Sequence, residues 1–313
     1  MPLRDELNGF LRLPRKFFGI GEPEKGIPDV GVLGVPYDLT SSHMPGCRFG
    51  PDAVREATDS ERSHSFPLNI GAKPRLNEDS LSKLITLEDI GDLEIIGRLP
   101  DAALLDISEA AAKLAVFDCD FLFLGGDHFI TYPLLKGIKR ARPGRYGLAY
   151  FDSHADFYAD YGGYSLSHAT TLKRLVEEKI IDLEDIIAYD LRSALPEQKK
   201  EILGDGQKTH TLESFQESLE LIAERVDSLY VTIDLDILRP NVQSSVSHPE
   251  SGGPDVETLV DFIRACFGIG KVRYADVVEL NPLSDKCGLG AIAARDVVKE
   301  VLTGFAYQKG LNL

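Results

Sequence analysis

Residues 150–156 carry three potential metal ligands directly after an apolar run of the chain. The segment is Tyr-Phe-Asp-Ser-His-Ala-Asp, with Asp152, His154 and Asp156 at alternate positions. In an extended chain, residues two apart point to the same side, so these three side chains would face one way and Ser153 the other. Three such groups are costly to bury unless a cation compensates their charge. The alternative is a solvated loop that follows a strand.

A second segment, residues 231–238, places two carboxylates at alternate positions of another apolar run. Asp234 and Asp236 would lie on the same side of a buried strand. Two neighbouring carboxylates stay ionised together only with a positive partner, and a metal ion is the usual one. The alternative is a capped strand end in which one of the two acids is protonated.

A third segment, residues 121–128, ends in Gly-Gly-Asp-His after an apolar run. The two glycines allow a tight turn that presents His128. A lone histidine is more often structural than a ligand, but this one has two acidic clusters to join. The three segments together offer two imidazoles and four carboxylates: His128, Asp152, His154, Asp156, Asp234 and Asp236.

These six side chains predict a site for two metal ions. The set is too large for one tetrahedral ion and suits two ions that share bridging carboxylates. Because the set is rich in oxygen and has no thiolate, it favours manganese or magnesium over a structural zinc. Two divalent ions balance the four carboxylates, and a hydroxide between them leaves a net negative charge that suits a cationic substrate.

Short apolar runs alternate with amphipathic segments along the chain, which predicts a parallel β-sheet with helices on both faces. The apolar runs, expected to form buried strands, cover residues 30–35, 121–124, 147–151, 186–189, 229–235 and 274–280. The amphipathic segments, expected to form helices, cover residues 102–117, 132–139, 169–178, 212–226, 256–266 and 291–302. Ligands of such sheets bind just beyond the carboxyl ends of the strands, where the acids and histidines lie. We therefore expect four neighbouring strand ends to converge on one site.

Length and composition exclude several classes of protein. The chain has 313 residues, of which 43% are hydrophobic and 27% charged, so it is not disordered, collagen-like or a coiled coil. No segment looks like a linker, and we expect one domain over residues 1–313 with its core at about 30–302. The net charge of −16 argues against nucleic-acid binding, which needs cations that face phosphates.

Cysteine usage and hydropathy indicate the compartment. The four cysteines are scattered without a CxxC pair, which fits ordinary thiols of a reducing compartment. Apolar runs long enough to span a membrane are absent from the sequence. Charges and proline interrupt the N-terminal segment, which argues against a signal peptide. We expect a cytoplasmic protein without a membrane partner.

Four motifs are similar in order and spacing to those of the ureohydrolase superfamily, which includes arginase, agmatinase and formiminoglutamase. They are GGDHFITYP at residues 125–133, FDSHADFY at 151–158, IDLDIL at 233–238 and DVVELNP at 276–282. The resemblance extends over residues 30–302 and is strongest to agmatinases of archaeal type. It implies an arginase-like three-layer α/β/α fold around an eight-stranded parallel sheet. It also implies two manganese ions (Mn2+) per chain and a homo-oligomer, usually a trimer or hexamer.

The resemblance implies a role for each of the six ligands. One manganese ion would be held by His128, Asp152, Asp156 and Asp234, and the other by Asp152, His154, Asp234 and Asp236. Asp152 and Asp234 would bridge the two ions. Asp156 would also orient the hydroxide that attacks the substrate.

Two further residues resemble the family's catalytic groups. His168, in Ser-His-Ala-Thr, resembles the proton-shuttling histidine, and Glu279 resembles the acid that pairs with the substrate guanidinium. Residues 162–168 contain glycine and serine, so we expect a flexible loop that lets His168 move over the site entrance. The alternatives are a structural histidine at a helix start and a surface acid, although an apolar strand runs into Glu279.

The chain also departs from the family pattern. The family's loop Pro-Gly-Thr-Gly-Thr-Pro-Glu-Pro-Gly-Gly is Ser-Ser-Val-Ser-His-Pro-Glu-Ser-Gly-Gly here, at residues 244–253. Because that loop lines the family's site, the loss of its threonines and glycines bears on substrate and rate. Ala169 replaces the glycine after the shuttle histidine, and Met44 stands where arginine is common. Ser153 replaces an alanine and should be harmless if it faces away from the ligands.

The sequence therefore predicts a manganese-dependent hydrolase that cleaves a guanidino C–N bond and releases urea. Its preferred substrate would be agmatine, which yields putrescine. The loop at residues 157–167 has no Lys, Arg or Asn to bind a carboxylate, but Tyr158, Tyr161, Tyr164 and Asp160 suit a terminal ammonium. Alternatively, these tyrosines only pack the subunit and Asp160 faces solvent.

Other functions stay open at this point. They are arginase, guanidinobutyrase or formiminoglutamase activity, a non-catalytic metal-binding homologue, and deacetylase-like chemistry on a related fold. The last class typically uses one zinc ion, which the full set of six ligands disfavours.

Overall fold

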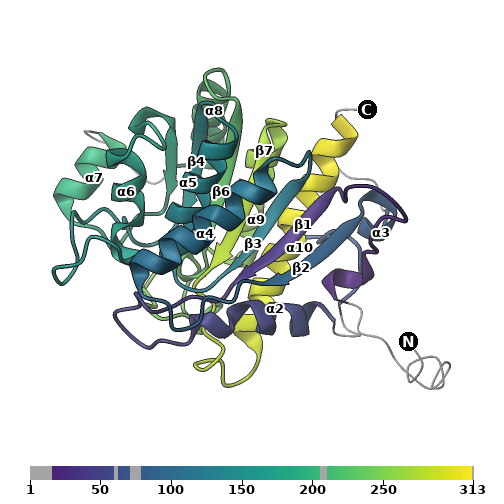
Figure 1. Cartoon of the computed structure of the whole chain (residues 1–313), viewed down its shortest axis with the longest axis horizontal. Helices are drawn as coiled ribbons and strands as arrows, with labels where there is room; N and C mark the ends of the chain where they lie inside the picture. The colour runs from purple at the N-terminus through teal and green to yellow at the C-terminus, as the bar shows by residue number, and fades with distance from the viewer. Residues whose placement is uncertain (1–15, 60–62, 71–78, 205–209, 312–313) are drawn as a thin grey trace.

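A seven-stranded, fully parallel β-sheet lies at the centre of the protein (Figure 1). The structure is a computed structural model that describes residues 16–59, 63–70, 79–204 and 210–311. The strands are β1 (Val30–Val35), β2 (Leu87–Asp92), β3 (Asp120–Gly125), β4 (Tyr146–Phe151), β5 (Ile186–Tyr189), β6 (Ser228–Asp234) and β7 (Val272–Val278). Their order in the sheet is β2-β1-β3-β7-β6-β4-β5. The predicted α/β class with a parallel sheet is confirmed.

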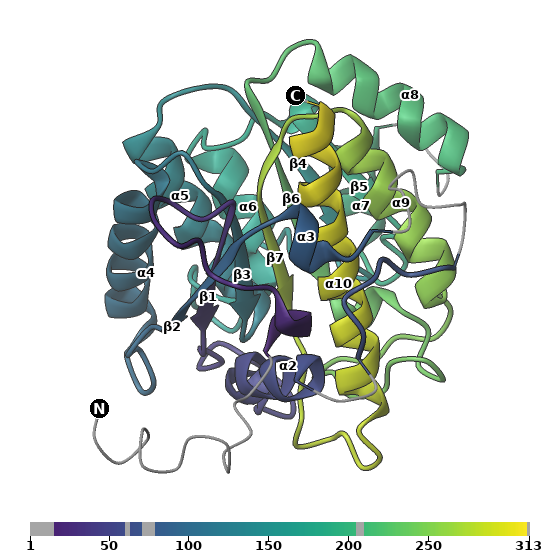
Figure 2. The same cartoon turned by 90° about the vertical axis from the view of Figure 1, so that its right-hand side faces the viewer.

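Helices cover both faces of the sheet and complete three layers (Figure 2). One face packs against α4 (Pro100–Ala115), α5 (Thr131–Ala141), α6 (Thr171–Glu177) and α7 (Pro196–Leu203). The other packs against α2 (Gly50–Thr58), α3 (Leu81–Leu84), α8 (Leu212–Ala223), α9 (Val256–Gly268) and α10 (Leu289–Leu311). Among the described residues, no helix is both long and apolar enough to cross a membrane.

The side chains of β3 show why the central strands are apolar throughout. Leu122 and Leu124 belong to one buried core, and Phe121 and Phe123 belong to the core on the opposite face. Successive side chains of a strand point to opposite faces, so a strand that is covered on both sides has no polar face. This continuous apolar character made six of the seven strands predictable.

The described residues contain seven strands, whereas the family resemblance implied eight. Among the seven, β2 is the one that the hydrophobic pattern missed. It is an edge strand with the sequence Leu-Glu-Asp-Ile-Gly-Asp, and every second residue is exposed. An edge strand with one solvent-exposed side has no continuous apolar run, so a search for such runs does not find it. Residues 1–15 of the predicted single domain lie outside the described residues.

Four strand ends that carry polar residues lie side by side, because β3, β7, β6 and β4 are consecutive neighbours in the sheet. His128 follows β3, Glu279 follows β7, Asp234 ends β6, and Asp152 follows β4. All of these strands are parallel, so their carboxyl ends meet at one edge of the sheet. This arrangement confirms the expected convergence.

Gly126 allows the tight turn between β3 and His128. A Cβ atom at this position would lie 1.7 Å from the carbonyl oxygen of Tyr37. The amide of Gly126 donates to the carbonyl of Val35 over 3.0 Å, and the amide of Asp127 donates to that of Tyr37 over 2.7 Å. These backbone bonds hold two chain segments so close together that only glycine fits between them.

We predict that Gly126→Ala destabilises the protein by about 2 kcal/mol or more, because its methyl group must displace the backbone of Tyr37. Gly21→Ala is the matched control, since a Cβ atom there meets nothing within 4 Å. Urea denaturation followed by circular dichroism measures both free energies of unfolding. Equal stability of the two variants would contradict this explanation of the turn.

Candidate active site

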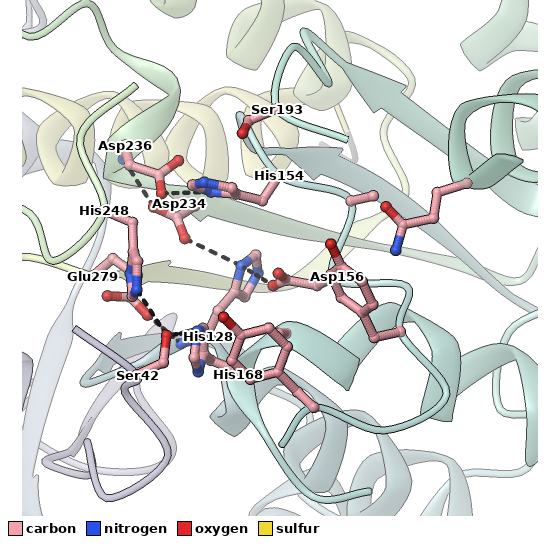
Figure 3. A pocket seen from close by; sticks show the side chains of 15 residues that line it. Ser42, His128, His154, Asp156, His168, Ser193, Asp234, Asp236, His248 and Glu279 are labelled. Atoms are coloured by element: carbon pink, nitrogen blue, oxygen red, sulfur yellow. Dashed lines mark hydrogen bonds and ion pairs between the residues drawn. The ribbon is translucent and has the colours of Figure 1, made fainter. Parts of the chain in front are cut away.

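The six predicted ligands come from three segments at the same edge of the sheet, and five of them, all except Asp152, are labelled in Figure 3. His128 begins the 3-10 turn His128–Ile130 after β3, and Asp236 lies in the turn Leu235–Ile237 after β6. The loop after β4 supplies the other histidine and two of the aspartates. The strands fix where these segments start, so the rigid sheet determines the distances between the side chains.

The first cluster is centred on Nδ1 of His128. This atom lies 2.9 Å from Oδ2 of Asp152, 3.2 Å from Oδ2 of Asp234 and 3.3 Å from Oδ2 of Asp156. All four residues are buried. Three of them, His128, Asp152 and Asp234, bring ligand atoms close enough together to hold one metal ion.

The second cluster adjoins the first and shares Asp152 with it. Nδ1 of His154 lies 2.9 Å from Oδ2 of Asp236 and 3.6 Å from Oδ1 of Asp152. These three residues could also hold a metal ion. Asp152 therefore offers one oxygen to each cluster, which is the geometry of a bridging carboxylate.

The hydrogen bonds around His128 determine which ring nitrogen is free. Asp276 accepts three hydroxyl hydrogen bonds, from Thr232 at 2.5 Å, Tyr230 at 2.7 Å and Thr131 at 2.8 Å. Because the Thr232 hydrogen is used there, the Thr232 oxygen accepts from Nε2 of His128, 2.9 Å away. In the neutral ring, Nδ1 then carries a lone pair, and this buried atom makes no hydrogen bond. A lone pair that faces three carboxylate oxygens fits a metal ion.

The electrostatics of the clusters lead to the same conclusion. Burial, together with repulsion from Asp236 and Asp152, raises the pKa of Asp234 well above its usual value. Burial and the charge of Asp152 raise the pKa of Asp156 to about 6. Burial lowers the pKa of His128, but the three carboxylates close to Nδ1 outweigh it and raise the pKa well above normal. The carboxylates thus need a positive charge among them, which divalent cations can supply.

The loop after β4 differs from the expected extended conformation. Asp156 has a φ of 45°, so the chain turns before it and its carboxylate meets the hydroxyl of Tyr150 at 3.1 Å. We expected Ser153 to face away from the ligands, but it points toward them. Its hydroxyl donates to Oδ1 of Asp236 over 2.7 Å and lies 3.1 Å from Nδ1 of His154. The chain therefore uses this serine to hold ligands of the second cluster.

Several hydrogen bonds anchor His168 at the end of the loop that was expected to be flexible. It begins a short helical turn that Ser167 caps, and its amide donates to Oγ1 of Thr40 over 3.0 Å. Its Nδ1 donates to the carbonyl of Thr40 over 2.6 Å. Burial and the neighbouring His248 lower the pKa of His168 to about 4. The ring is therefore neutral at neutral pH, with a lone pair on Nε2.

Glu279 is buried directly beside the first cluster. Its Oε1 accepts from the amide of His128 at 2.9 Å, and its Oε2 accepts from the thiol of Cys47 at 3.2 Å. The backbone of Glu279 has a φ of 65°, and its amide donates to the carbonyl of Gly126. Burial raises the pKa of this carboxyl group to about 7.

A cavity of about 180 Å³ joins these groups to the solvent (Figure 3). Its wall includes five of the predicted ligands together with His168 and Glu279: His128, His154, Asp156, Asp234 and Asp236. Sequence analysis missed other residues of the wall, among them Ser42, Ser193, Gln198 and His248. They lie in loops or in α7, where no hydrophobic period marks them. The sequence did draw attention to His248, because this residue lies in the loop at 244–253 that departs from the family pattern and was expected to line the site.

The loop at residues 157–167 contributes to this cavity only in part. Tyr158 and Tyr161 line it, as predicted. Tyr164 and Asp160 are exposed and do not line it, and Asp160 instead accepts a hydrogen bond from the amide of Gly163. Spacing along a loop does not determine which way its side chains point, so two of these four predictions were wrong.

Comparison with known proteins identifies the family. The sequence model of the Arginase family matches residues 28–304. The chain belongs to the arginase family. This assignment confirms the ureohydrolase relationship that the four motifs indicated.

Several arginase-family relatives match almost the whole chain. An agmatinase of Bacillus subtilis is 29% identical, with 93% of this chain and 96% of the relative covered. An agmatinase of Neisseria gonorrhoeae is 31% identical, with 94% and 91% covered. The solved structure of proclavaminate amidino hydrolase from Streptomyces clavuligerus is 26% identical. It matches with a TM-score of 0.79, with 95% of this chain and 98% of the other covered. The protein is accordingly a hydrolase that acts on amidine or guanidino C–N bonds.

We predict that Thr232→Val weakens binding of metal ions by about 10- to 100-fold, because His128 loses the acceptor that fixes its tautomer. Thr232→Ser keeps the hydroxyl group and serves as the control, with affinity close to that of the wild type. Calorimetric titration of metal-free protein with Mn2+ gives the affinity and the number of ions. Equal affinity of the valine and serine variants would show that the hydroxyl group does not position His128.

Proposed function

We propose that this arginase-family protein hydrolyses agmatine to putrescine and urea with two manganese ions. The observation that carries the proposal is the shared cavity, in which the buried carboxylate of Glu279 faces the two adjacent His/Asp clusters. A carboxylate recognises a guanidinium by paired, charge-assisted hydrogen bonds. The proposed ligands are His128, Asp152, His154, Asp156, Asp234 and Asp236.

The chain's own groups would orient the substrate and move the proton. Divalent ions at such a site supply hydroxide near neutral pH. The hydrogen bonds from Cys47 and the His128 amide would hold the Glu279 carboxylate so that it places the guanidinium carbon beside the clusters. Asp156 would orient the attacking group, because the Tyr150 hydroxyl fixes its carboxylate. His168 would carry the proton to the leaving amine at its Nε2 atom.

The cavity wall supports agmatine over arginine. The two substrates share the guanidinium, but arginine adds a carboxylate that needs cations or several donors. Neither lysine nor arginine occurs among the described residues that line the cavity. The ring faces of Tyr158 and Tyr161 suit the terminal ammonium of agmatine. The agmatinase names of the relatives agree with this choice.

The cytoplasmic location and the trimeric or hexameric assembly remain predictions from the sequence. Neither is needed for the proposed chemistry, because every group invoked above comes from one chain.

We predict that the manganese-loaded protein releases urea from agmatine with a kcat/KM at least about tenfold above that for arginine. The physical reason is the absence of cationic lining for the arginine carboxylate among the described residues. A coupled urea assay at matched concentrations measures both, with guanidinobutyrate and formiminoglutamate (formamide release) as further substrates. A higher value for arginine would reject the substrate assignment. No turnover of any compound by protein holding two ions would favour the non-catalytic homologue.

We predict that His168→Asn lowers kcat for agmatine by about 10²–10⁴-fold, because the proton to the leaving amine loses its carrier. Bound manganese should stay unchanged, since His168 is outside both clusters. His64→Asn, at a histidine that does not line the cavity, is the control. Metal analysis and steady-state kinetics over pH 7–10 test both variants. Wild-type rates for His168→Asn over that range would exclude the role.

A further inference from the structure

His248 lies in the loop that departs from the family pattern and reaches the cavity wall beside His168. The two imidazole rings are stacked, with centroids 5.1 Å apart and planes inclined by 21° (Figure 3). Nothing in the chemistry proposed above uses His248. A cavity-lining imidazole in contact with the proposed proton carrier nevertheless calls for a physical explanation.

Ser42 connects the two rings through its hydroxyl group. Its Oγ lies 3.0 Å from Nε2 of His248 and 3.3 Å from Nε2 of His168. A hydroxyl group has one hydrogen to donate and can also accept, so the Ser42 hydroxyl can donate to one ring while it accepts from the other.

The backbone contact of His168 determines the direction of this chain of hydrogen bonds. Nδ1 of His168 lies 2.6 Å from the carbonyl oxygen of Thr40, which can only accept, so Nδ1 carries the hydrogen. In the neutral ring, Nε2 then accepts from the Ser42 hydroxyl. Because the hydroxyl hydrogen is used there, the Ser42 oxygen accepts from the Nε2–H group of His248.

The loop that carries His248 is anchored on both sides of the cavity. The hydroxyl of Ser247 donates to the carbonyl of Met44 over 3.0 Å and lies 3.0 Å from the thiol of Cys47. The amide of Asn281 donates to the carbonyl of Ser245 over 2.8 Å. These contacts tie the loop to the segments before α2 and after β7, so the position of His248 is determined by the fold.

We propose that His248 is a positioning residue whose Nε2–H group orients the Ser42 hydroxyl toward His168 and so keeps the His168 ring in place with Nε2 directed at that hydroxyl. The inference rests on the proposed function, in which His168 carries the proton. A hydrogen bond donated to the lone pair of Nε2 stabilises the neutral ring. A proton taken up at Nε2 would therefore be given up readily to the leaving amine.

The surroundings of His168 make its titration a direct readout of this arrangement. The rings of His248 and Tyr161 face it, Thr40 and Ser42 contact it, and the more distant His154 and His128 add positive charge when they are protonated. The ring hydrogen-bonds to Thr40, Ser42 and Ser167, and none of these contacts involves a carboxylate of the metal clusters. A change in the Ser42 hydrogen bond should therefore shift the pKa of His168.

The NMR test uses single-residue variants of the full-length, magnesium-loaded protein, because Mn2+ broadens nearby NMR signals. His248→Phe keeps a stacked ring and removes the N–H donor, His248→Gln keeps a donor without a charge, and Ser42→Ala removes the link. His43→Phe is the matched control, since the ring of His43 also contacts that of His248, with centroids 5.9 Å apart, while the Ser42 hydroxyl bonds to His248 and His168. The chain has seven histidines, so His168→Asn identifies the His168 signal by its loss.

We expect His248→Phe and Ser42→Ala both to raise the pKa of His168 from about 4 toward its ordinary value, and His248→Phe by the larger amount because it also removes the charge of His248. His248→Gln keeps the donor and loses only the charge of His248, so it should raise this pKa less than His248→Phe does, and His43→Phe should leave it near that of the wild type. With manganese and agmatine, His248→Phe and Ser42→Ala should each lower kcat by about tenfold with little change in KM. The double variant should lose no more than either single variant, because both remove the same chain of hydrogen bonds.

Three results would overturn the inference: an unchanged His168 titration in His248→Phe, a glutamine variant that behaves like the phenylalanine variant, or additive losses in the double variant. The NMR titration does not depend on turnover. Expected shifts in a protein that hydrolyses no guanidino compound would therefore reject the proposed function while the positioning of His168 stands. Normal turnover without the shifts would reject the positioning alone.

Discussion

The structure of the site depends on one constraint, which is the burial of several carboxylates around two imidazoles, with no lysine or arginine in the clusters as described. The four aspartates Asp152, Asp156, Asp234 and Asp236 are all buried, and within the clusters they pair with His128 and His154. Carboxylates at this spacing repel one another unless positive charge lies between them. The arrangement is therefore stable as a site for cations, and the surrounding hydrogen bonds serve to hold that geometry.

The fold meets this constraint with rigid strands and a few strained residues. Parallel strands bring the ligand segments together, but a regular strand end cannot aim every side chain at one point. Asp156 and Glu279 have positive φ values, which are costly for residues other than glycine and cluster at functional sites. Gly126 allows the backbone of Tyr37 to approach the turn that carries His128. Local strain of this kind is balanced by the packing of the two cores.

Sequence analysis recovered what depends on regular geometry. Six strands, the helical layers and the convergence of four strand ends follow from hydrophobic patterns and from the rules for parallel sheets. It failed where side-chain direction depends on loop conformation. Ser153 contacts Asp236 instead of facing away, and Asp160 points to solvent. Loop torsions are determined by tertiary contacts, which one sequence without its fold does not reveal.

The loop at residues 244–253 shows how the departure from the family pattern is compatible with an intact site. Glu250 accepts from the hydroxyl of Ser193 at 2.8 Å and lies 3.6 Å from Nε2 of His154. A carboxylate beside the outer nitrogen of a ligand histidine orients the ring and makes it a stronger ligand. Thus Glu250 supports the second cluster, whereas His248 contacts the proposed proton carrier. Because the clusters themselves come from strand ends, this loop can vary the surroundings of the reaction without disturbing the ligands.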